Sequence, residues 1–399
     1  MDARTSRRTF LSSAAAVGAV MAAPGLAVRA VAGVVATGPI LKPLPADQFI
    51  DFGTNAEMRW SSVGAHEYLT PQSRLFVRNH TRTPLIDADA WRLRVFGDGL
   101  ASPKGEGDAL ALSYAELRRL PHTRVTTTHE CTGNGRSFFA TQQGQAPSGT
   151  AWTLGAVGTV RWEGVRLAHV LRRLGIRPDA VSIQATGLDD NYVSGGVDYG
   201  RVRRPFPVDK ALDDAILAWG MNGLDLLPDH GFPVRLVLPG WVGIASIKWL
   251  GSLEISTREL TSPWNTNWYR MTGGDHPADT KPLTVNPVRS AWELARGQVI
   301  ERRRQVTLHG RSWSGAGAIA RVEVSTDDGA SWRDARLLRP ERPGGWTQWR
   351  FDWERPARGG HVLMARATDS AGRTQPESTP YNDGGYFFDA VVRHPVRVA

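Results

Sequence analysis

The chain has 399 residues, of which 41% are hydrophobic and 22% are charged, with 15 tryptophans. This composition is typical of a folded protein and excludes a disordered or fibrous chain, and the length predicts two domains after a leader. The 48 lysines and arginines exceed the 39 acidic residues, and the net charge of +9 favours anionic ligands. No basic run alternates with stacking aromatic residues, so nucleic acid is not an expected partner.

The first 32 residues have the pattern of an export signal. Arg7 and Arg8 precede a weakly apolar segment rich in alanine and valine at 14–28, with small residues up to Ala32. This segment is shorter than the roughly 20 residues that a membrane-spanning helix needs. We therefore expect residues 1–32 to be a twin-arginine signal, no membrane span, and an exported, periplasmic or other extracytoplasmic protein. The twin-arginine route carries folded proteins, which favours a protein that holds a cofactor.

Residues 33–284 mix strand and helix patterns. Residues 91–97 alternate as an amphipathic strand, and residues 233–240 form an apolar run typical of a buried strand. Residues 165–176 place apolar side chains at helical spacing and include a glycine stop at Gly175. Because no steady strand–helix repeat is present, we expect an α+β fold and not a doubly wound sheet.

Residues 285–399 consist of short alternating runs that are typical of strands. Asp328 and Gly329 form a predicted hairpin turn, and alternation places Trp349, Phe351 and Trp353 on one face of a strand. The runs lie at 305–313, 319–332, 346–354 and 361–372. Turn signals between them predict a β-sandwich of immunoglobulin type. No low-complexity linker precedes this region, so we expect the two domains to pack closely.

Cys131 is the single cysteine, which excludes an intramolecular disulfide, and it lies in the stretch TTTHECTGNGRSFF. Residues 126–129 are a predicted strand, and the following glycines end it, so Cys131 lies at a strand edge where it can face a cavity. We expect Gly133 and Gly135 to allow close approach of a ligand. We also expect the charge of Arg136 to lower the pKa of the thiol.

Several chemistries are compatible with a single cysteine. A zinc site is not favoured, because His129, Glu130 and Cys131 are adjacent on a strand and point to alternate faces. The string after the cysteine has Phe138 where a dinucleotide fingerprint needs its third glycine. A cysteine hydrolase and a non-enzymatic exported binding protein with a buried Cys131 stay open. A further option is a metal whose other ligands come from an organic cofactor.

The sequence resembles the sulfite oxidase family of molybdenum enzymes over nearly the whole mature chain. The motifs that carry the resemblance are FVRNH (76–80), CTGNGR (131–136), the long segment from MNGLDLLPDHG to SIKWLG (221–251), and the strand-rich tail. The resemblance implies a molybdopterin-binding catalytic domain at 33–284 followed by an immunoglobulin-like dimerisation domain at 285–399. It also implies that Cys131 is the sole protein ligand of a molybdenum–molybdopterin cofactor.

By the same resemblance, the catalytic residues are Arg78, Cys131, Arg136 and Tyr269. Cofactor-binding residues are expected at matching positions that offer cations and planar donors to a phosphate and a pterin. These positions are Phe76, Val77, Arg78, Asn79, His80, Cys131, Asp189, His230, Arg235, Ser246, Ile247 and Lys248.

The resemblance implies oxidation of a small anionic sulfur substrate, sulfite, to sulfate. The chain has no Cys-x-x-Cys-His haem attachment motif, so we expect the electrons to pass to a separate c-type cytochrome or haem subunit. The resemblance also implies that the protein forms a homodimer or a hetero-oligomer. Two departures bear on the substrate: Gly384 stands where the family has an arginine, and the family's lysine after the cysteine is missing. Oxidation of protein-bound sulfur by a sulfane dehydrogenase-type enzyme is therefore the alternative.

Overall fold

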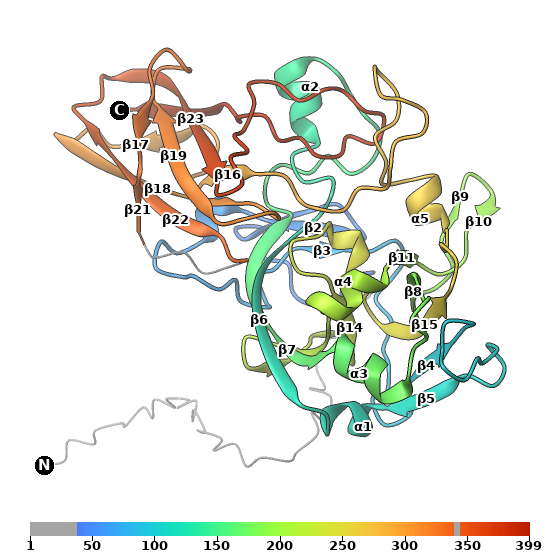
Figure 1. Ribbon diagram of the computed structural model, residues 1–399. Coiled ribbons are helices and arrows are strands. Elements are labelled where there is room, and N and C mark those ends of the chain that lie inside the picture. The colour runs from blue at the N-terminus through green and yellow to red at the C-terminus, as the bar shows by residue number, and fades with distance from the viewer. Residues whose placement is uncertain (1–37, 339–343) are drawn as a thin grey trace, which may run out of the picture. The chain divides into compact units, whose positions relative to one another are not determined.

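The computed structural model describes residues 38–338 and 344–399 (Figure 1). The predicted export signal at 1–32 lies outside the described residues. The part of the chain that is described is mostly β-structure, with five short α-helices. No helix within residues 38–338 or 344–399 is long and apolar enough to cross a membrane.

One five-stranded sheet supports the large apolar core of the first part of the chain. Its order is β11–β8–β15–β4–β5, in which β15 and β4 are parallel and the other neighbours are antiparallel. The predicted strand at 91–97 is β4, which buries Leu93 and Val95 and exposes Arg92 and Arg94, as its alternation requires. The strands are β11 (Arg203–Pro207), β8 (Ser182–Gly187), β15 (Leu250–Ser256), β4 (Arg92–Phe96) and β5 (Leu110–Ser113).

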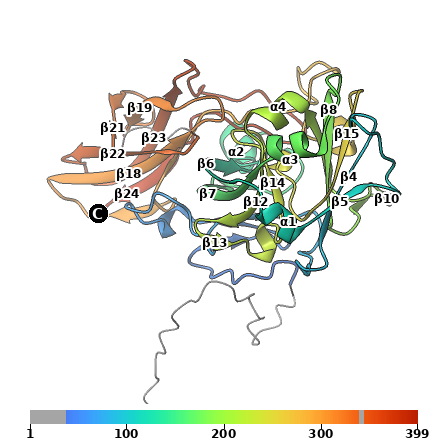
Figure 2. The ribbon, with the colours of Figure 1, turned by 60° about the horizontal axis from the view of Figure 1, so that its bottom comes forward.

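A second five-stranded sheet carries the strand that precedes Cys131. Its order is β13–β12–β7–β6, and β14 also pairs with β12. Figures 1 and 2 both show β6 beside β7, and their antiparallel register runs from His122–Val165 to Glu130–Val157. The predicted strands at 126–129 and 233–240 are found in β6 and β14. The strands are β13 (Leu224–Asp225), β12 (Ile216–Met221), β7 (Val157–Arg166), β6 (His122–Glu130) and β14 (Arg235–Val237).

The helices are short and border these sheets. The helix predicted at 165–176 is α3 (Leu167–Leu174), which buries Leu167, Val170 and Leu171 and ends at Gly175 with φ of 76°. The others are α1 (Tyr114–Arg118), α2 (Ser137–Gln143), α4 (Val208–Asp213), α5 (Pro263–Thr266) and the 3₁₀ turns η1 (Trp60–Ser62), η2 (Pro228–His230) and η3 (Gly243–Ala245). A small sheet comprises β1 (Phe49–Asp51), β2 (Asn55–Met58) and β3 (Val77–Arg78), and a hairpin comprises β9 (Val193–Ser194) and β10 (Val197–Asp198).

The C-terminal region contains two sheets with a shared apolar core. Trp349, Phe351 and Trp353 all lie on the buried face of β22, as predicted, and pack with residues of both sheets. Asp328 and Gly329 have φ of 57° and 88° in the turn between β19 and β20, which confirms the predicted turn. One sheet is β16 (Arg289–Trp292), β18 (Gln305–Trp313), β22 (Thr347–Glu354) and β21 (Arg336–Leu337); the other is β17 (Gln298–Ile300), β24 (His394–Val398), β23 (Gly359–Asp369), β19 (Ile319–Ser325) and β20 (Arg333–Asp334).

The C-terminal sheets pack closely against the region that holds Cys131. Trp60 lies between Trp313 and Trp346, with ring centroids 5.9 and 5.7 Å apart. The amide of Thr128 on β6 donates to the carbonyl of Gly344 (2.6 Å). Close packing was expected from the absence of a linker, and it brings residues of the C-terminal region within reach of the site.

Candidate active site

Cys131 is fixed at the end of β6 by a network of buried hydrogen bonds. Its amide donates to Ala156 O (2.9 Å), and its carbonyl accepts from the amide of Asn134 (2.9 Å). Asn134 in turn donates to Glu130 Oε1 (2.8 Å) and accepts from the Ala156 amide (3.0 Å). Alternation along the strand turns His129 and Cys131 towards a cavity and Glu130 away from it. The asparagine of the CTGNGR motif therefore sets the backbone of the loop.

The glycines of this loop make room for protein side chains. A Cβ on Gly133 would lie 2.5 Å from Nη2 of Arg136, and a Cβ on Gly149 would lie 2.9 Å from Nη1. Gly135 has φ of 86°, and its Cβ would lie 3.2 Å from Cβ of Phe388. We expected Gly133 and Gly135 to allow a ligand to approach. Their close neighbours are the side chains of Arg136 and Phe388, but Gly133 also lines a cavity at Cys131, so the expectation for Gly133 stays a prediction.

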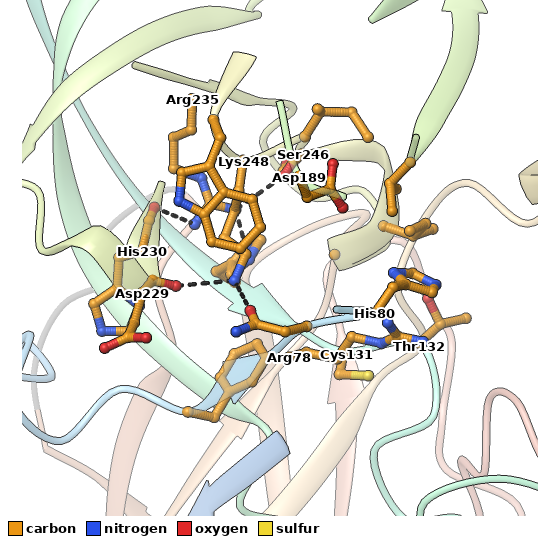
Figure 3. Close-up of a pocket in the computed structure, with 18 of the residues that line it drawn as sticks. Arg78, His80, Cys131, Thr132, Asp189, Asp229, His230, Arg235, Ser246 and Lys248 are labelled. Carbon is orange, nitrogen blue, oxygen red and sulfur yellow. Dashed lines mark hydrogen bonds between the residues drawn. The ribbon is translucent and has the colours of Figure 1, made fainter. Parts of the chain in front are cut away.

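An inner cavity begins at Cys131. Eleven of the twelve predicted cofactor-binding residues line it, together with Tyr269. Figure 3 shows Arg235, Lys248 and His230 at one end of this cavity and Cys131, His80 and Thr132 at the other. The exception is Val77, whose side chain packs in a small core with Ile40, Phe49 and Ala56. The lining residues that the sequence reasoning missed include His129, Thr132, Asp229 and Trp249.

The polar groups of the inner cavity are held in place but are only partly satisfied by the protein. Lys248 Nζ donates to the side chain of Asn79 and to Asp229 O (2.9 Å). Arg235 donates to His230 O (3.1 Å) and Ser246 O (2.9 Å). Buried atoms without a protein partner include Nη1 of Arg78, Nε of Arg235, Oδ1 of Asp189 and Oγ1 of Thr132. Because unpartnered buried polar atoms are costly, these four atoms mark the cavity as a site for a large polar ligand.

Burial shifts the pKa values of the cavity residues. It lowers the pKa of Lys248 well below its usual range, and it lowers the pKa of Arg235 to about 9. Burial also raises the pKa of Asp189 to about 6. The histidines at 80, 129 and 230 have pKa values well below 6.5, first through burial and then through nearby cations, so they are neutral. An anionic ligand would stabilise the charged forms of Lys248 and Arg235.

The thiol of Cys131 is also buried, and burial raises its pKa although the guanidiniums of Arg78 and Arg136 oppose this. Arg136 does lower the pKa of the thiol, as we expected, but desolvation outweighs the two cations, so the net shift of the pKa is upward. A metal ion bound at sulfur would remove the proton outright. Within the described residues, no group of three or more His, Cys, Asp or Glu side chains could hold a metal. A metal at Cys131 would thus need its other ligands from a cofactor, which fits molybdenum with molybdopterin.

A second cavity, here called the vestibule, lies on the other side of Cys131. Arg78, Asn79, His80, Cys131 and Tyr269 line both cavities, so the sulfur lies at their junction. The vestibule has a volume of about 540 Å³, and its further lining residues include Trp152, Tyr192, Trp268, Arg136, Asp383, Gly384 and Tyr386. The predicted catalytic residues Arg78, Cys131, Arg136 and Tyr269 thus lie together on its wall.

Arg136 is held rigidly in the vestibule. Its Nε donates to Gly384 O (2.8 Å) and its Nη1 to Thr150 O (2.9 Å), while its guanidinium lies 5.5 Å from the ring centroid of Tyr386. Tyr386 stacks on Tyr269, with ring centroids 5.1 Å apart. A Cβ on Gly384 would lie 2.3 Å from the ring of Tyr386. The tyrosine therefore fills the space in which a side chain at position 384 would begin.

The C-terminal region supports the cysteine loop from behind. Arg289 on β16 donates to Glu130 Oε1 (2.9 Å) and to Asn134 O (2.5 Å), and the side chains of this ion pair are 2% and 1% exposed. The amide of Phe387 donates to Thr132 O (3.1 Å). Sequence reasoning missed Arg289 and Tyr386. Tyr386 lies two residues after Gly384 and could have been singled out there, whereas Arg289 has no local signal because its partner is 159 residues away.

Comparison with known proteins agrees with these features. Residues 80–264 match the family described as the oxidoreductase molybdopterin binding domain, and residues 283–397 match the Mo-co oxidoreductase dimerisation domain. Sulfite oxidase of Gallus gallus is 35% identical over 332 residues, which cover 79% of this chain and 69% of that protein. Mitochondrial sulfite oxidase of Homo sapiens is 35% identical over 332 residues, covering 78% of this chain but 58% of the human protein.

A solved structure is also similar. The sulfane dehydrogenase SoxCD from Paracoccus pantotrophus superposes with a TM-score of 0.72 at 27% sequence identity, covering 88% of this chain and 85% of that chain. The similarity spans both regions described above. A molybdenum–molybdopterin cofactor is consistent with the inner cavity, with the thiol of Cys131 at its end, and with the matched families.

Proposed function

Because the chain belongs to the sulfite oxidase family of molybdopterin-dependent oxidoreductases, we propose that it oxidises sulfite to sulfate and passes the electrons to an external acceptor. The observation that carries the proposal is the position of Cys131. Its sulfur lies where a cation-rich inner cavity meets a vestibule that contains two further guanidiniums. One cavity suits the cofactor, and the other gives a small anion access to the metal.

The inner cavity would hold the cofactor through cations and backbone-anchored donors. Lys248 and Arg235 would meet the anionic end, since both are buried cations with limited protein partners. Asp189 and Thr132 offer unpartnered oxygens to polar ring atoms. When bound, the molybdenum group supplies two-electron oxidation and oxygen-atom transfer. The protein's tasks are to orient this group through Cys131 and to exclude water from the inner cavity.

Arg78 and Arg136 would bind the anionic substrate beside the metal. Guanidiniums keep their charge and need little reorganisation when their positions are fixed. Arg136 is fixed by two backbone carbonyls, and Arg78 keeps a buried Nη1 without a protein partner. Tyr269 lines the same wall, and burial raises the pKa of its hydroxyl, so it remains a hydrogen-bond donor. These groups would orient the sulfur lone pair towards the metal.

A sulfane dehydrogenase-type reaction on protein-bound sulfur is the second candidate. It is supported by the neutral wall at Gly384 and Tyr386, where the sequence departs from the family's arginine, and by the likeness to SoxCD. A less charged wall suits a substrate with fewer negative charges than sulfite. The two candidates share the cofactor and differ in what the vestibule must admit.

The surroundings of the enzyme are also proposals. We infer export by the twin-arginine route from the leader with Arg7 and Arg8, and a c-type cytochrome or haem subunit as the electron acceptor from the lack of a haem attachment motif. The residues matched to a dimerisation domain support a homodimer or hetero-oligomer. We also propose that the first region is of the α+β class and that the C-terminal sandwich is of immunoglobulin type.

The test is sulfite-dependent reduction of ferricyanide by molybdenum-loaded protein, with Cys131→Ala as the control. The expected result is turnover by the wild type and none by the variant. Loaded wild-type protein that does not turn over sulfite but oxidises a protein-bound persulfide would instead establish the second candidate. Loaded protein inactive towards both would refute the proposed function.

A further inference from the structure

The vestibule is much larger than a sulfite ion requires. Its volume of about 540 Å³ lies within the roughly 300–1,000 Å³ range of pockets that bind drug-sized ligands, whereas sulfite has only four atoms. Trp268 and Tyr192 line the space, and their rings lie 5.7 Å apart in an edge-to-face contact. The vestibule therefore offers an aromatic wall that a four-atom anion would not use.

Three arginines bring positive charge to the lining of the vestibule: Arg78, Arg136, and Arg270, whose guanidinium donates to the carbonyls of Thr280 and Ala278. Arg78 and Arg136 lie beside Cys131. Two N–H groups of Arg136 already donate hydrogen bonds to the carbonyls of Gly384 and Thr150. The neighbouring wall is neutral, because Gly384 has no side chain and the ring of Tyr386 occupies the adjacent space. Asp383 adds a negative charge farther along the lining. With Arg270 and Asp383 both in the remaining lining, this distribution matches a ligand with one compact anionic group beside Cys131 and an uncharged remainder.

We infer that the vestibule admits organosulfinates, R–SO₂⁻, whose organic group lies against the wall formed by Trp268 and Tyr192 while the sulfinate binds Arg78 and Arg136. This inference rests on the proposed function, because it uses the same metal site. A sulfinate sulfur keeps the lone pair that sulfite has, with a carbon substituent in place of one oxygen. It carries one negative charge, which suits a site with a neutral wall.

The reaction balances as R–SO₂⁻ + H₂O → R–SO₃⁻ + 2 H⁺ + 2 e⁻. One sulfur–oxygen bond forms, the oxygen comes from water, and both O–H bonds of that water break. The sulfur is oxidised by two electrons, which pass through the cofactor to the one-electron acceptor of the proposed function. The carbon–sulfur bond stays intact, so the product is a sulfonate.

The test is ferricyanide reduction by loaded protein with benzenesulfinate as substrate, and detection of benzenesulfonate that carries oxygen-18 from labelled water. Trp268→Ala removes an aromatic wall and is expected to raise the KM for benzenesulfinate roughly tenfold, with the KM for sulfite changed less than about threefold. Trp332→Ala is the matched control, because Trp332 is a half-buried tryptophan in the C-terminal region that contacts Arg366 and not the vestibule. It should leave both KM values unchanged.

A binding measurement does not depend on turnover or on the folding of a variant. Calorimetry on loaded wild-type protein is expected to give a Kd for benzenesulfonate roughly tenfold lower than the Kd for sulfate. Turnover of sulfite without turnover or binding of the benzene compounds would overturn the inference and leave the proposed function standing. Benzenesulfinate oxidation that Trp268→Ala leaves unchanged would overturn the assigned wall. Loaded protein that oxidises neither sulfite nor benzenesulfinate would refute the inference together with sulfite oxidation.

Discussion

Replacing Arg289 with methionine should destabilise the protein and disturb the metal site together. Arg289 and Glu130 form a buried ion pair with an Nη1–Oε1 distance of 2.9 Å, and the side chains are 2% and 1% exposed. Removal of one partner of such a pair leaves an uncompensated charge and typically costs about 3–5 kcal/mol. The arginine also donates to Asn134 O, so the cysteine loop loses its anchor. We expect Arg289→Met to lower the free energy of unfolding by about 3–5 kcal/mol.

The double variant Glu130→Gln/Arg289→Met removes both charges and should recover a large part of this loss. The assay is urea unfolding followed by tryptophan fluorescence at equal cofactor loading, because bound cofactor itself adds stability. A loss below about 1 kcal/mol in the single variant, or a double variant no more stable than the single, would refute the reasoning.

A matched control separates lost stability from a disturbed site. Arg311 and Glu293 form another buried pair, with an Nε–Oε1 distance of 2.7 Å and side chains 0% and 5% exposed. Arg311 donates to Gly64 O and lies over Trp346, and it makes no hydrogen bond to the cysteine loop. Arg311→Met should lose similar stability but retain the kcat and molybdenum spectrum of the wild type. Equal loss of kcat in both variants, measured well below their unfolding midpoints, would contradict a specific role for Arg289.

Three further variants test the buried carboxyl of Glu57, which accepts hydrogen bonds from Thr153 and Gly155, the cysteine loop, and the inner cavity. Burial raises the pKa of Glu57 to about 7, so the stability that its protonated form contributes is complete below about pH 4.5 and is lost as the pH rises through 7. Between pH 4.5 and 7.5 the free energy of unfolding of the wild type, measured with urea, should therefore fall by about 3 kcal/mol more than that of Glu57→Gln. If the two proteins lose stability equally over this range, the raised pKa of Glu57 is rejected. Gly133→Ala places a methyl group 2.5 Å from the guanidinium of Arg136 and should raise the KM for sulfite roughly tenfold or more at unchanged molybdenum content; an unchanged KM would exclude Arg136 from substrate binding. Lys248→Met removes a buried cation from the inner cavity and should reduce the molybdenum retained after purification roughly tenfold. The circular dichroism spectrum should stay unchanged. Full retention of molybdenum would show that Lys248 is not needed to hold the cofactor.

Local sequence patterns predicted the strands, helices and turns that depend on side-chain periodicity or on glycine and asparagine positions. The strand β4, the helix α3 with its glycine stop, and the turn at Asp328 and Gly329 follow from side-chain periodicity and from backbone preferences within a few residues. The strand-to-loop position of Cys131 followed from the same kind of signal. The candidate site residues followed from motif resemblance, and the structure brings all of them except the Val77 side chain to the two cavities.

The remaining features depend on burial and on contacts between distant segments. The pKa of Cys131 is raised and not lowered because desolvation outweighs its two neighbouring arginines, and no local pattern gives the depth of burial. Gly133 accommodates Arg136 because the guanidinium turns back over the loop to reach carbonyls of residues 150 and 384. The ion pair of Glu130 with Arg289 was missed for the same reason, because the two residues lie 159 positions apart.

The anchoring of Arg136 and the cysteine loop by residues near the C-terminus affects when the site can form. The carbonyl that accepts from Arg136 Nε lies 248 residues later in the chain, and the Thr132 carbonyl accepts from the amide of Phe387. Chains are synthesised from the N-terminus at about 5–20 residues per second, and contacts of such large sequence separation form slowly. The ribosome therefore synthesises at least 248 residues beyond Arg136 before the loop acquires these supports. Cofactor insertion into a finished site must follow translation, and under the proposed export route it also precedes translocation.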